Sequence, residues 1–190
     1  MRAWTLAATS MNYHRPWTLA CGWKGQHRLR LSCRATNSIF TDCPETKLVD
    51  AIPKEYRTIT PYLLVTGVPA LLEFLQKAFD AAVLKTEVRD DGSIMHAEVR
   101  VGNSMLMAGE ASADFIPMPA SIYLYVEHCD AVYQRALNAG ASIVFPISDL
   151  PSGERYGGVR DASGNVWWIA THVEDVSDDE QRKRWATFKR

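Results

Sequence analysis

The chain has 190 residues, which is enough for one well-buried domain and leaves little for a second. Its 47% hydrophobic and 23% charged residues are typical of a globular protein, and no apolar run approaches the roughly 18 residues of a membrane span. Residues 1–40 carry six basic side chains and no acidic one, so the rest of the chain has a net charge of −7 within the overall −1. A domain with this net negative charge is a poor partner for nucleic acid. We therefore expect neither nucleic-acid binding nor a membrane location.

Residues 1–51 form a segment of a different kind, without sustained helical or strand periodicity. The segment is rich in Arg, Ser and Thr and has no acid before Asp42. One interpretation is a transit peptide that directs the protein to a mitochondrial or other organellar matrix. The other is a disordered extension, produced by an upstream start codon, which has no role and leaves the protein in the cytoplasm. Only one of the four cysteines, Cys129, lies beyond this segment, so no disulfide framework is predicted and a reducing compartment is expected.

An internal repeat defines the organisation of the remaining chain. Tyr62–Val65 recurs as Tyr123–Val126, at an offset of 61 residues, and the offset continues without a gap through the following helix. Each copy has a β-rich run, an amphipathic helix and three short strands. The predicted strands are Thr58–Val65, Val83–Arg89, Ile94–Val101 and Ser104–Ala108 in the first copy, and Ser121–Val126, Ser142–Ile147, Tyr156–Arg160 and Val166–Thr171 in the second.

The predicted fold class is α+β, with two tandem βαβββ modules. Residues 52–190 form this domain, with the modules at about 56–110 and 119–173. A closing helix is predicted at about 177–188, because Ser177 can cap a helix whose first turn is acidic. One face of each sheet is covered by its own helix and the other must find a partner. We therefore expect a curved mixed sheet around a ligand-binding cleft.

This order of elements resembles the vicinal oxygen chelate superfamily, which includes glyoxalase I, fosfomycin and bleomycin resistance proteins and extradiol dioxygenases. The resemblance covers Ile52 to about Arg184 and includes Val126–Ala131 after the fifth strand and Asp161–Asn165 before the last. Further motifs resemble its PhnB-like branch: Thr60–Leu63, Ile94–Glu98, Leu106–Met107, Arg155–Gly157 and Thr171–Ser177. The resemblance implies a small-molecule ligand and a homodimer.

Metal-dependent members of the superfamily hold a divalent ion with four His, Gln or Glu ligands. The resemblance carries those positions to Thr60, to Leu106 or Met107, to Ser121 and to Trp168. None of these side chains is an imidazole, carboxylate or thiolate, and an indole would fill the space that a metal needs. We expect no metal cofactor at these positions, which argues against glyoxalase and dioxygenase chemistry.

The third strand provides the candidate catalytic residues. Its alternation places Met95, Ala97, Val99 and Val101 on the helix-covered face, and His96, Glu98 and Arg100 on the other. A His and a carboxylate two residues apart on a strand can act as base and orienting group, or can bind a polar ligand. Two alternatives remain open, namely a solvated strand face with an ordinary ion pair, and a metal held by His96, Glu98 and a third group.

The other candidate ligand-binding residues lie on the neighbouring strands. They are Thr60, Tyr62, Arg100, Met107, Ser121, Tyr123, Arg155 and Trp168. Their aromatic, weakly polar character suits a flat or apolar ligand, although the same aromatics could fill the core between the sheets. Arg155, predicted at the rim of the cleft, could meet an anionic group or could be a surface residue without a role.

Three functional hypotheses follow. The first is a protein of this superfamily that binds a small molecule, aromatic or amphipathic, without the four-ligand metal site. The second is an isomerase or lyase of the glyoxalase type that uses His96 and Glu98, with or without a divalent metal. The third is a structural or interaction module whose cleft is filled by its own side chains.

Overall fold

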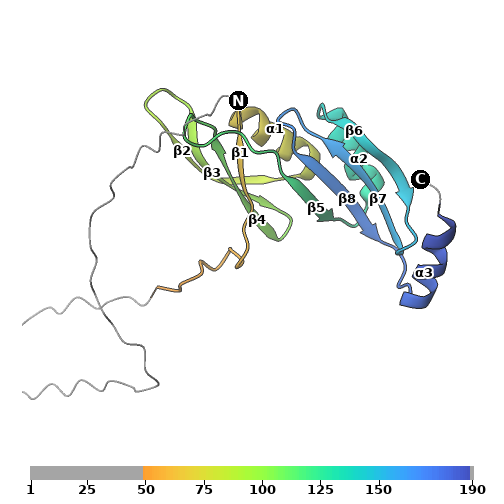
Figure 1. The fold of residues 1–190 in the computed structure, drawn as a ribbon. Coiled ribbons are helices and arrows are strands. Elements are labelled where there is room, and N and C mark those ends of the chain that lie inside the picture. Colours follow the sequence, from red (N-terminus) through yellow and green to blue (C-terminus); the bar gives the residue numbers. More distant parts are fainter. Residues whose placement is uncertain (1–48, 189–190) are drawn as a thin grey trace, which may run out of the picture. The chain divides into compact units, whose positions relative to one another are not determined.

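The computed structural model describes residues 49–188, so the predictions for residues 1–48 lie outside the described residues. The described chain forms eight strands and three helices (Figure 1). The first βαβββ module consists of β1 (Tyr62–Val65), α1 (Val68–Phe79), β2 (Ala82–Val88), β3 (Ile94–Val101) and β4 (Ser104–Glu110). The second consists of β5 (Ser121–Tyr125), α2 (Cys129–Asn138), β6 (Ser142–Asp149), β7 (Glu154–Arg160) and β8 (Val166–His172), followed by α3 (Asp178–Thr187).

The two modules have the same topology. The strand order is β1-β4-β3-β2 in the first sheet and β5-β8-β7-β6 in the second. In each sheet the first strand runs parallel to the last, and the other neighbours are antiparallel. The predicted α+β fold with tandem βαβββ modules is therefore confirmed. Its strands make two separate four-stranded sheets.

Each helix covers one face of its own sheet. In α1 the apolar stripe includes Leu71 and Leu75, which are buried together with Leu63 of β1 and Val99 of β3. The start of α1 is stabilised from a distant position, because the Glu110 carboxylate accepts hydrogen bonds from the backbone N–H groups of the residues at 67 and 68. This carboxylate replaces the capping side chain that the helix lacks locally.

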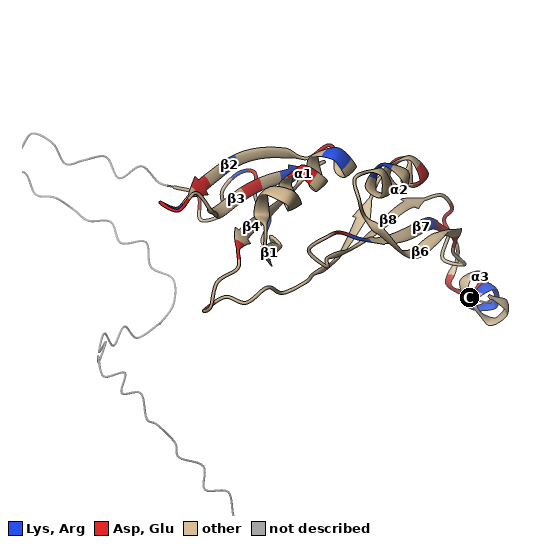
Figure 2. Ribbon diagram, turned by 90° about the horizontal axis from the view of Figure 1, so that it is seen from above, with Lys and Arg blue, Asp and Glu red and all other residues tan. Residues whose placement is uncertain are grey.

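The modules meet on their helix-covered sides, where α1 and α2 lie next to one another (Figure 2). Arg135 of α2 donates from Nε to the Ala78 carbonyl oxygen over 3.2 Å, and its Nη2 lies 2.8 Å from Asp80 Oδ2. The ring of Phe79 packs against Trp167 with centroids 5.0 Å apart, and Trp167 is fully buried. Trp167 is therefore a core residue.

Two strands begin more than one residue away from the predicted start. β1 begins at Tyr62 rather than at Thr58, because pairing with β4 starts at Tyr62 and the preceding Pro61 has no N–H to donate. β7 begins at Glu154, two residues earlier than predicted, because both Glu154 and Arg155 pair with β8.

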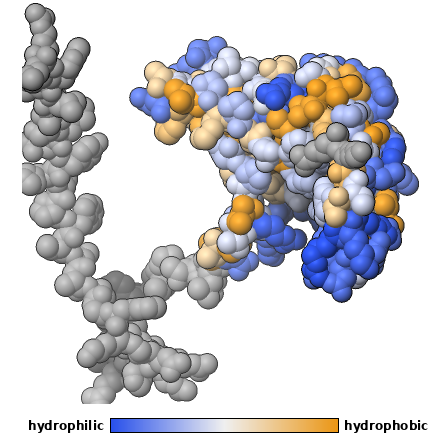
Figure 3. All heavy atoms as spheres, turned by 45° about the vertical axis from the view of Figure 1, so that its right-hand side comes forward, coloured by the Kyte–Doolittle hydropathy of each residue, from blue (hydrophilic) through white to orange (hydrophobic). Residues whose placement is uncertain are grey.

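The helix α3 follows the second module. Ser177 caps it as predicted, since its Oγ accepts a hydrogen bond from the Glu180 N–H. Among the described residues of α3 none is buried, and its hydrophilic surface is blue in Figure 3. A bidentate ion pair between Arg184 and Glu174 ties it to the segment after β8. None of the helices within residues 49–188 is long and apolar enough to cross a membrane.

Candidate functional site

The face of the first sheet that α1 leaves uncovered carries most of the predicted polar residues. Strand pairing places Tyr62, Met107 and Glu98 side by side, because Met107 is the register partner of both of the others. His96 and Arg100 project from the same face of β3, as the alternation predicted. We call this surface the first open face and define it by Tyr62, His96, Glu98, Arg100 and Met107.

His96 lies between an aromatic ring and a carboxylate on the first open face. The Tyr62 ring stacks on its imidazole with a centroid distance of 5.7 Å and an interplanar angle of 15°. His96 Nε2 lies 3.8 Å from Glu98 Oε1, which is too long for a hydrogen bond and gives an ion pair when the imidazole is protonated. Tyr62 can lie flat here because its hydroxyl occupies the space where a Cβ of Gly109 would be. The predicted His96 and Glu98 pair is therefore close together and held by neighbouring groups.

The segment before β1 adds Tyr56, which the sequence did not single out. Its hydroxyl is shielded from solvent and makes no hydrogen bond of acceptable geometry within the described chain. Burial, followed by the adjacent Glu98 carboxylate, raises the pKa of Tyr56 to about 12. Tyr56, Glu98, Met107 and Thr60 line a pocket of about 470 Å³. Three predicted site residues, Thr60, Glu98 and Met107, therefore line the same pocket, which is covered by a segment without regular structure.

The uncovered face of the second sheet is aromatic. Trp168 and Tyr123 are register partners, and Tyr156 of β7 lies beside them. The Tyr156 ring is nearly parallel to both neighbours, at 15° to Tyr123 over 6.5 Å and at 23° to Trp168 over 5.9 Å. Trp168 Nε1 donates to Ser121 Oγ over 2.9 Å. We call this surface the second open face and define it by Ser121, Tyr123, Tyr125, Glu154, Tyr156 and Trp168.

One carboxylate stands at the end of this aromatic group. Glu154 accepts hydrogen bonds from the Tyr125 hydroxyl over 2.5 Å and from the Tyr123 hydroxyl over 3.2 Å. Burial and the negative charge of Glu154 raise the pKa of Tyr123 above its usual range, and the hydrogen bond to Glu154 does the same for Tyr125. Both phenols are therefore neutral donors at physiological pH.

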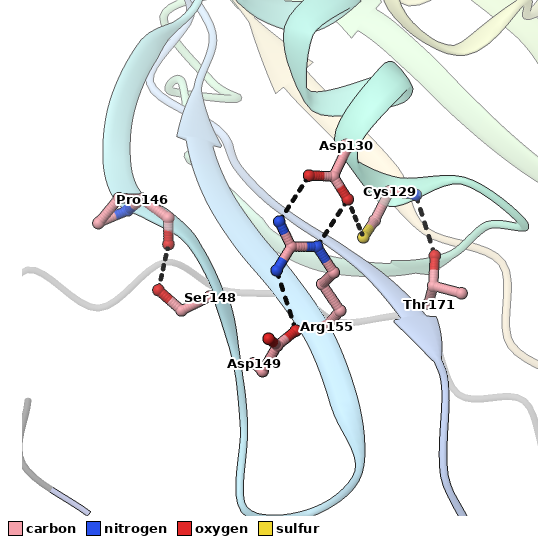
Figure 4. A network of polar contacts seen from close by, with 7 residues as sticks. All are labelled: Cys129, Asp130, Pro146, Ser148, Asp149, Arg155 and Thr171. Carbon is pink, nitrogen blue, oxygen red and sulfur yellow. Dashed lines mark hydrogen bonds and ion pairs between the residues drawn. The ribbon is translucent and has the colours of Figure 1, made fainter.

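Arg155 does not belong to either open face. It is next to Tyr156 in β7 and so points to the opposite side of the sheet, towards α2 (Figure 4). Its guanidinium makes two hydrogen bonds of 2.7 Å to Asp130 and one of 2.9 Å to Asp149. These bonds hold the pKa of Asp130 below its usual range. These contacts attach the first turn of α2 to the sheet. Arg155 therefore does not lie in a cleft beside the open faces, where the sequence analysis placed it.

The side chains at the four metal-ligand positions do not fit a divalent ion. Trp168 and Ser121 are hydrogen-bonded to one another, Leu106 is buried under the helix, and the Thr60 hydroxyl donates to the Arg57 carbonyl oxygen. Within residues 49–188, no three His, Cys, Asp or Glu side chains are grouped so that they could hold a metal. Within these residues, His96 and Glu98 therefore have no third His, Cys, Asp or Glu beside them that could complete a metal site.

In a single chain the two open faces do not form one cleft. Between them, the described residues show no ion pair, side-chain hydrogen bond or ring contact. Tyr62 remains 46% exposed and Tyr123 43% exposed. A larger hollow of about 950 Å³ lies between the modules, lined by Phe79, Leu106, Leu124, Val132 and Trp167 among others. Of the predicted site residues it includes only Tyr123.

Sequence reasoning missed Glu154 and Tyr156 of the second open face, and Tyr56 in the pocket beside Glu98. Tyr156 and Glu154 could have been found, because they lie two residues apart on a strand next to Trp168. Glu154 was omitted because the predicted strand began at Tyr156, two residues after it. Tyr56 lies in an irregular segment whose position over Glu98 has no signal in the local sequence.

The fold and the sequence agree with one superfamily. The sequence profile described as Glyoxalase/Bleomycin resistance protein/Dioxygenase superfamily matches residues 58–169, more than half of the chain. The chain therefore belongs to this superfamily, as the resemblance predicted. The Mycobacterium bovis protein Mb0911c is 34% identical over 133 residues, which cover 64% of this chain and 88% of that protein. Rv0887c of Mycobacterium tuberculosis is also 34% identical over 133 residues, covering 78% of its length.

Two solved structures illustrate the fold. TioX from Micromonospora sp. ML1 is 26% identical, with a TM-score of 0.53, and the match covers 60% of this chain and 98% of TioX. A PhnB protein from Bacillus cereus is 22% identical, with a TM-score of 0.51, and the match covers 60% of this chain and 99% of that protein. At this identity the second similarity concerns the fold alone.

Proposed function

We propose that this protein binds a small, flat aromatic molecule on the second open face, without the four-ligand metal site of its superfamily. The observation that carries this proposal is the near-parallel arrangement of Tyr123, Tyr156 and Trp168 on a surface that no helix covers. Aromatic rings gain about 0.5–1.5 kcal/mol per stacked or edge-to-face contact beyond the burial of their area. Because Tyr123, Tyr156 and Trp168 are partly exposed, a ligand that stacks on them can gain this energy.

The first open face supplies a polar complement. A cup with an aromatic wall and a polar wall would fix the orientation of a small molecule, as ligand pockets generally do with a few placed polar groups. Since the two faces do not meet within one chain, the cup forms between two chains of a homodimer. The apolar segment before β5 supports this arrangement, because Phe115, Ile116 and Met118 are each at least 65% exposed.

Light scattering over a range of protein concentrations tests the homodimer. The full-length chain should have the mass of a dimer, and Ile116→Asp should shift it towards the monomer because a buried charge opposes association. Val173→Asp, which places the same charge at an exposed apolar residue after β8, serves as the control. A wild-type protein that is monomeric at all concentrations would contradict the dimeric cup.

Calorimetric titration with a panel of planar aromatic compounds tests the binding function. Trp168→Leu should weaken binding of any compound that binds by about tenfold or more, because a stacking partner is lost from the centre of the surface. Trp185→Leu removes an exposed tryptophan from α3 and should leave binding unchanged. Equal binding by wild type and Trp168→Leu would overturn the proposal.

The contacts of His96 support a second candidate, an isomerase or lyase of the glyoxalase type. His96 has a carboxylate at 3.8 Å and a stacked Tyr62, so that it could move a proton in a held orientation. His96→Gln should abolish such an activity and leave binding on the second open face intact. A compound that is bound but never converted, by wild type or variant, would argue against this candidate.

The expected location follows from cysteine chemistry. Cys129 is buried and forms no disulfide within residues 49–188, and such thiols are typical of proteins in a reducing compartment such as the cytoplasm.

A further inference from the structure

The surroundings of Glu154 indicate which kind of aromatic molecule would fit the second open face. Its two carboxylate oxygens accept hydrogen bonds from three hydroxyl groups, those of Tyr123, Tyr125 and Ser152. These donors hold the carboxylate in place at the end of the aromatic rings, but they are neutral and leave its negative charge uncompensated.

No protein cation balances this charge in the described part of the chain. Among residues 49–188, no Lys, Arg or His nitrogen lies within 4.0 Å of the Glu154 carboxylate. His172, its register partner on β8, points to Asp175 instead, with Nε2 2.9 Å from Oδ1. Arg160 is on the same strand six residues away, which is about 20 Å along an extended backbone. The charge of Glu154 therefore dominates its end of the open face.

Aromatic rings add to the attraction for a cation. Each ring has a negative face, and a cation within about 6 Å of a ring centroid is attracted to it. Tyr125 packs against Tyr123, with centroids 5.2 Å apart, and both reach the Glu154 carboxylate through their hydroxyls. A positively charged group placed on these rings would thus also be close to the carboxylate.

Resting on the binding function proposed above, we infer that the ligand of the second open face is a planar aromatic cation, with Glu154 as its counter-ion. The flat ring system of such a ligand stacks on Tyr156 and Trp168, while its positive charge lies towards Glu154. Neutral ligands of the same shape gain only the stacking contribution, and anions are repelled.

Calorimetric titration of the full-length protein with three probes of similar size separates stacking from charge. The probes are N-methylquinolinium as the cation, quinoline as the neutral ring system and naphthoate as the anion. We expect the wild type to bind the cation about tenfold more tightly than quinoline, and naphthoate least of all. The preference should decrease at high salt, since the carboxylate is partly exposed.

Glu154→Gln keeps the shape and an acceptor oxygen for the tyrosine hydroxyls but removes the charge. In this variant the cation and quinoline should bind equally, while the affinity for quinoline stays at its wild-type value. Glu73→Gln removes one exposed carboxylate from α1 and should keep the full preference. A thermal unfolding curve close to that of the wild type confirms that each variant is folded.

The outcomes distinguish the two proposals. Equal binding of cation and quinoline by the wild type, or a preference that persists in Glu154→Gln, would overturn the inference about charge while leaving aromatic binding intact. Failure of all three probes to bind would overturn the inference and the binding function together.

Discussion

The indole ring of Trp168 lies across the backbone of its register partner Gly158. A Cβ added at Gly158 would lie 2.5 Å from Cζ3 and 2.7 Å from Cε3 of the indole, far inside normal contact distance. The absence of a side chain at Gly158 therefore allows the indole to lie flat beside Tyr156. This relationship makes the aromatic surface sensitive to a single methyl group.

Gly158→Ala should displace the Trp168 ring. We expect a loss of stability of about 1–3 kcal/mol, the usual cost of overpacking, together with about tenfold weaker binding of any aromatic ligand. Urea denaturation and calorimetric titration measure the two effects. In the double variant with Trp168→Ala, the Gly158→Ala change should cost much less stability, because the colliding ring is absent. An equal cost in both backgrounds would show that the ring does not depend on the glycine.

Glu110→Ala should destabilise the first module. Its carboxylate bonds to two backbone N–H groups at the start of α1, over 2.7 and 2.9 Å, and those donors are left without a protein partner in the variant. By analogy with other charged helix caps, we expect a loss of about 1–3 kcal/mol in the free energy of unfolding. Glu110→Gln can replace only one of the two acceptor oxygens and should be intermediate. A wild-type unfolding curve for Glu110→Ala would refute this role.

Asp161→Ala should have a larger effect in the second module. Asp161 is 5% exposed and accepts hydrogen bonds from the side chains of Asn165 and Trp167, both fully buried. Removal leaves these donors unsatisfied in the core, at a cost of roughly 3 kcal/mol or more. Asp90→Ala, at an exposed turn residue, provides the control in thermal unfolding. Equal melting temperatures for the two variants would contradict the proposed contribution of the buried network.

The Arg155 and Asp130 pair predicts a pH dependence. Arg155 holds the pKa of Asp130 below its unfolded value of about 4, so the pair contributes stability above that pH and loses it as the pH falls through the lower, folded value. Arg155→Met should therefore lower stability at neutral pH and flatten the dependence below about pH 4. Denaturation curves at a series of pH values test this. Parallel curves for wild type and variant would argue against the pair.

The helices and strands could be predicted from the sequence because each has a local pattern that recurs in the other module. The 61-residue offset aligned Tyr62 with Tyr123, and these residues occupy equivalent positions on the two open faces. Even the ring pairs correspond, since Tyr62 stacks on His96 and Tyr123 on Tyr156, both at 15°. Alternation along β3 correctly placed His96 and Glu98 on one face.

Other features depend on contacts between distant segments, which local patterns do not encode. Arg155 was assigned to the rim of the cleft because the strand was begun one residue after it. Inclusion of Arg155 in β7 places it on the face opposite to Tyr156. The bonds of Glu110 to the start of α1 span more than 40 residues. The separation of the open faces in one chain also depends on helix packing between modules, which periodicity does not describe.

The most direct test of the central claim follows the indole N–H signals of the full-length protein by heteronuclear NMR during titration with N-methylquinolinium. Signals of Trp168 and Trp185 are assigned from Trp168→Leu and Trp185→Leu. Binding on the second open face predicts a saturable shift of the Trp168 signal, with the Trp185 signal unmoved. A Trp168 signal that stays in place while the ligand binds elsewhere, or does not bind, would contradict the assignment of this aromatic surface as the binding site.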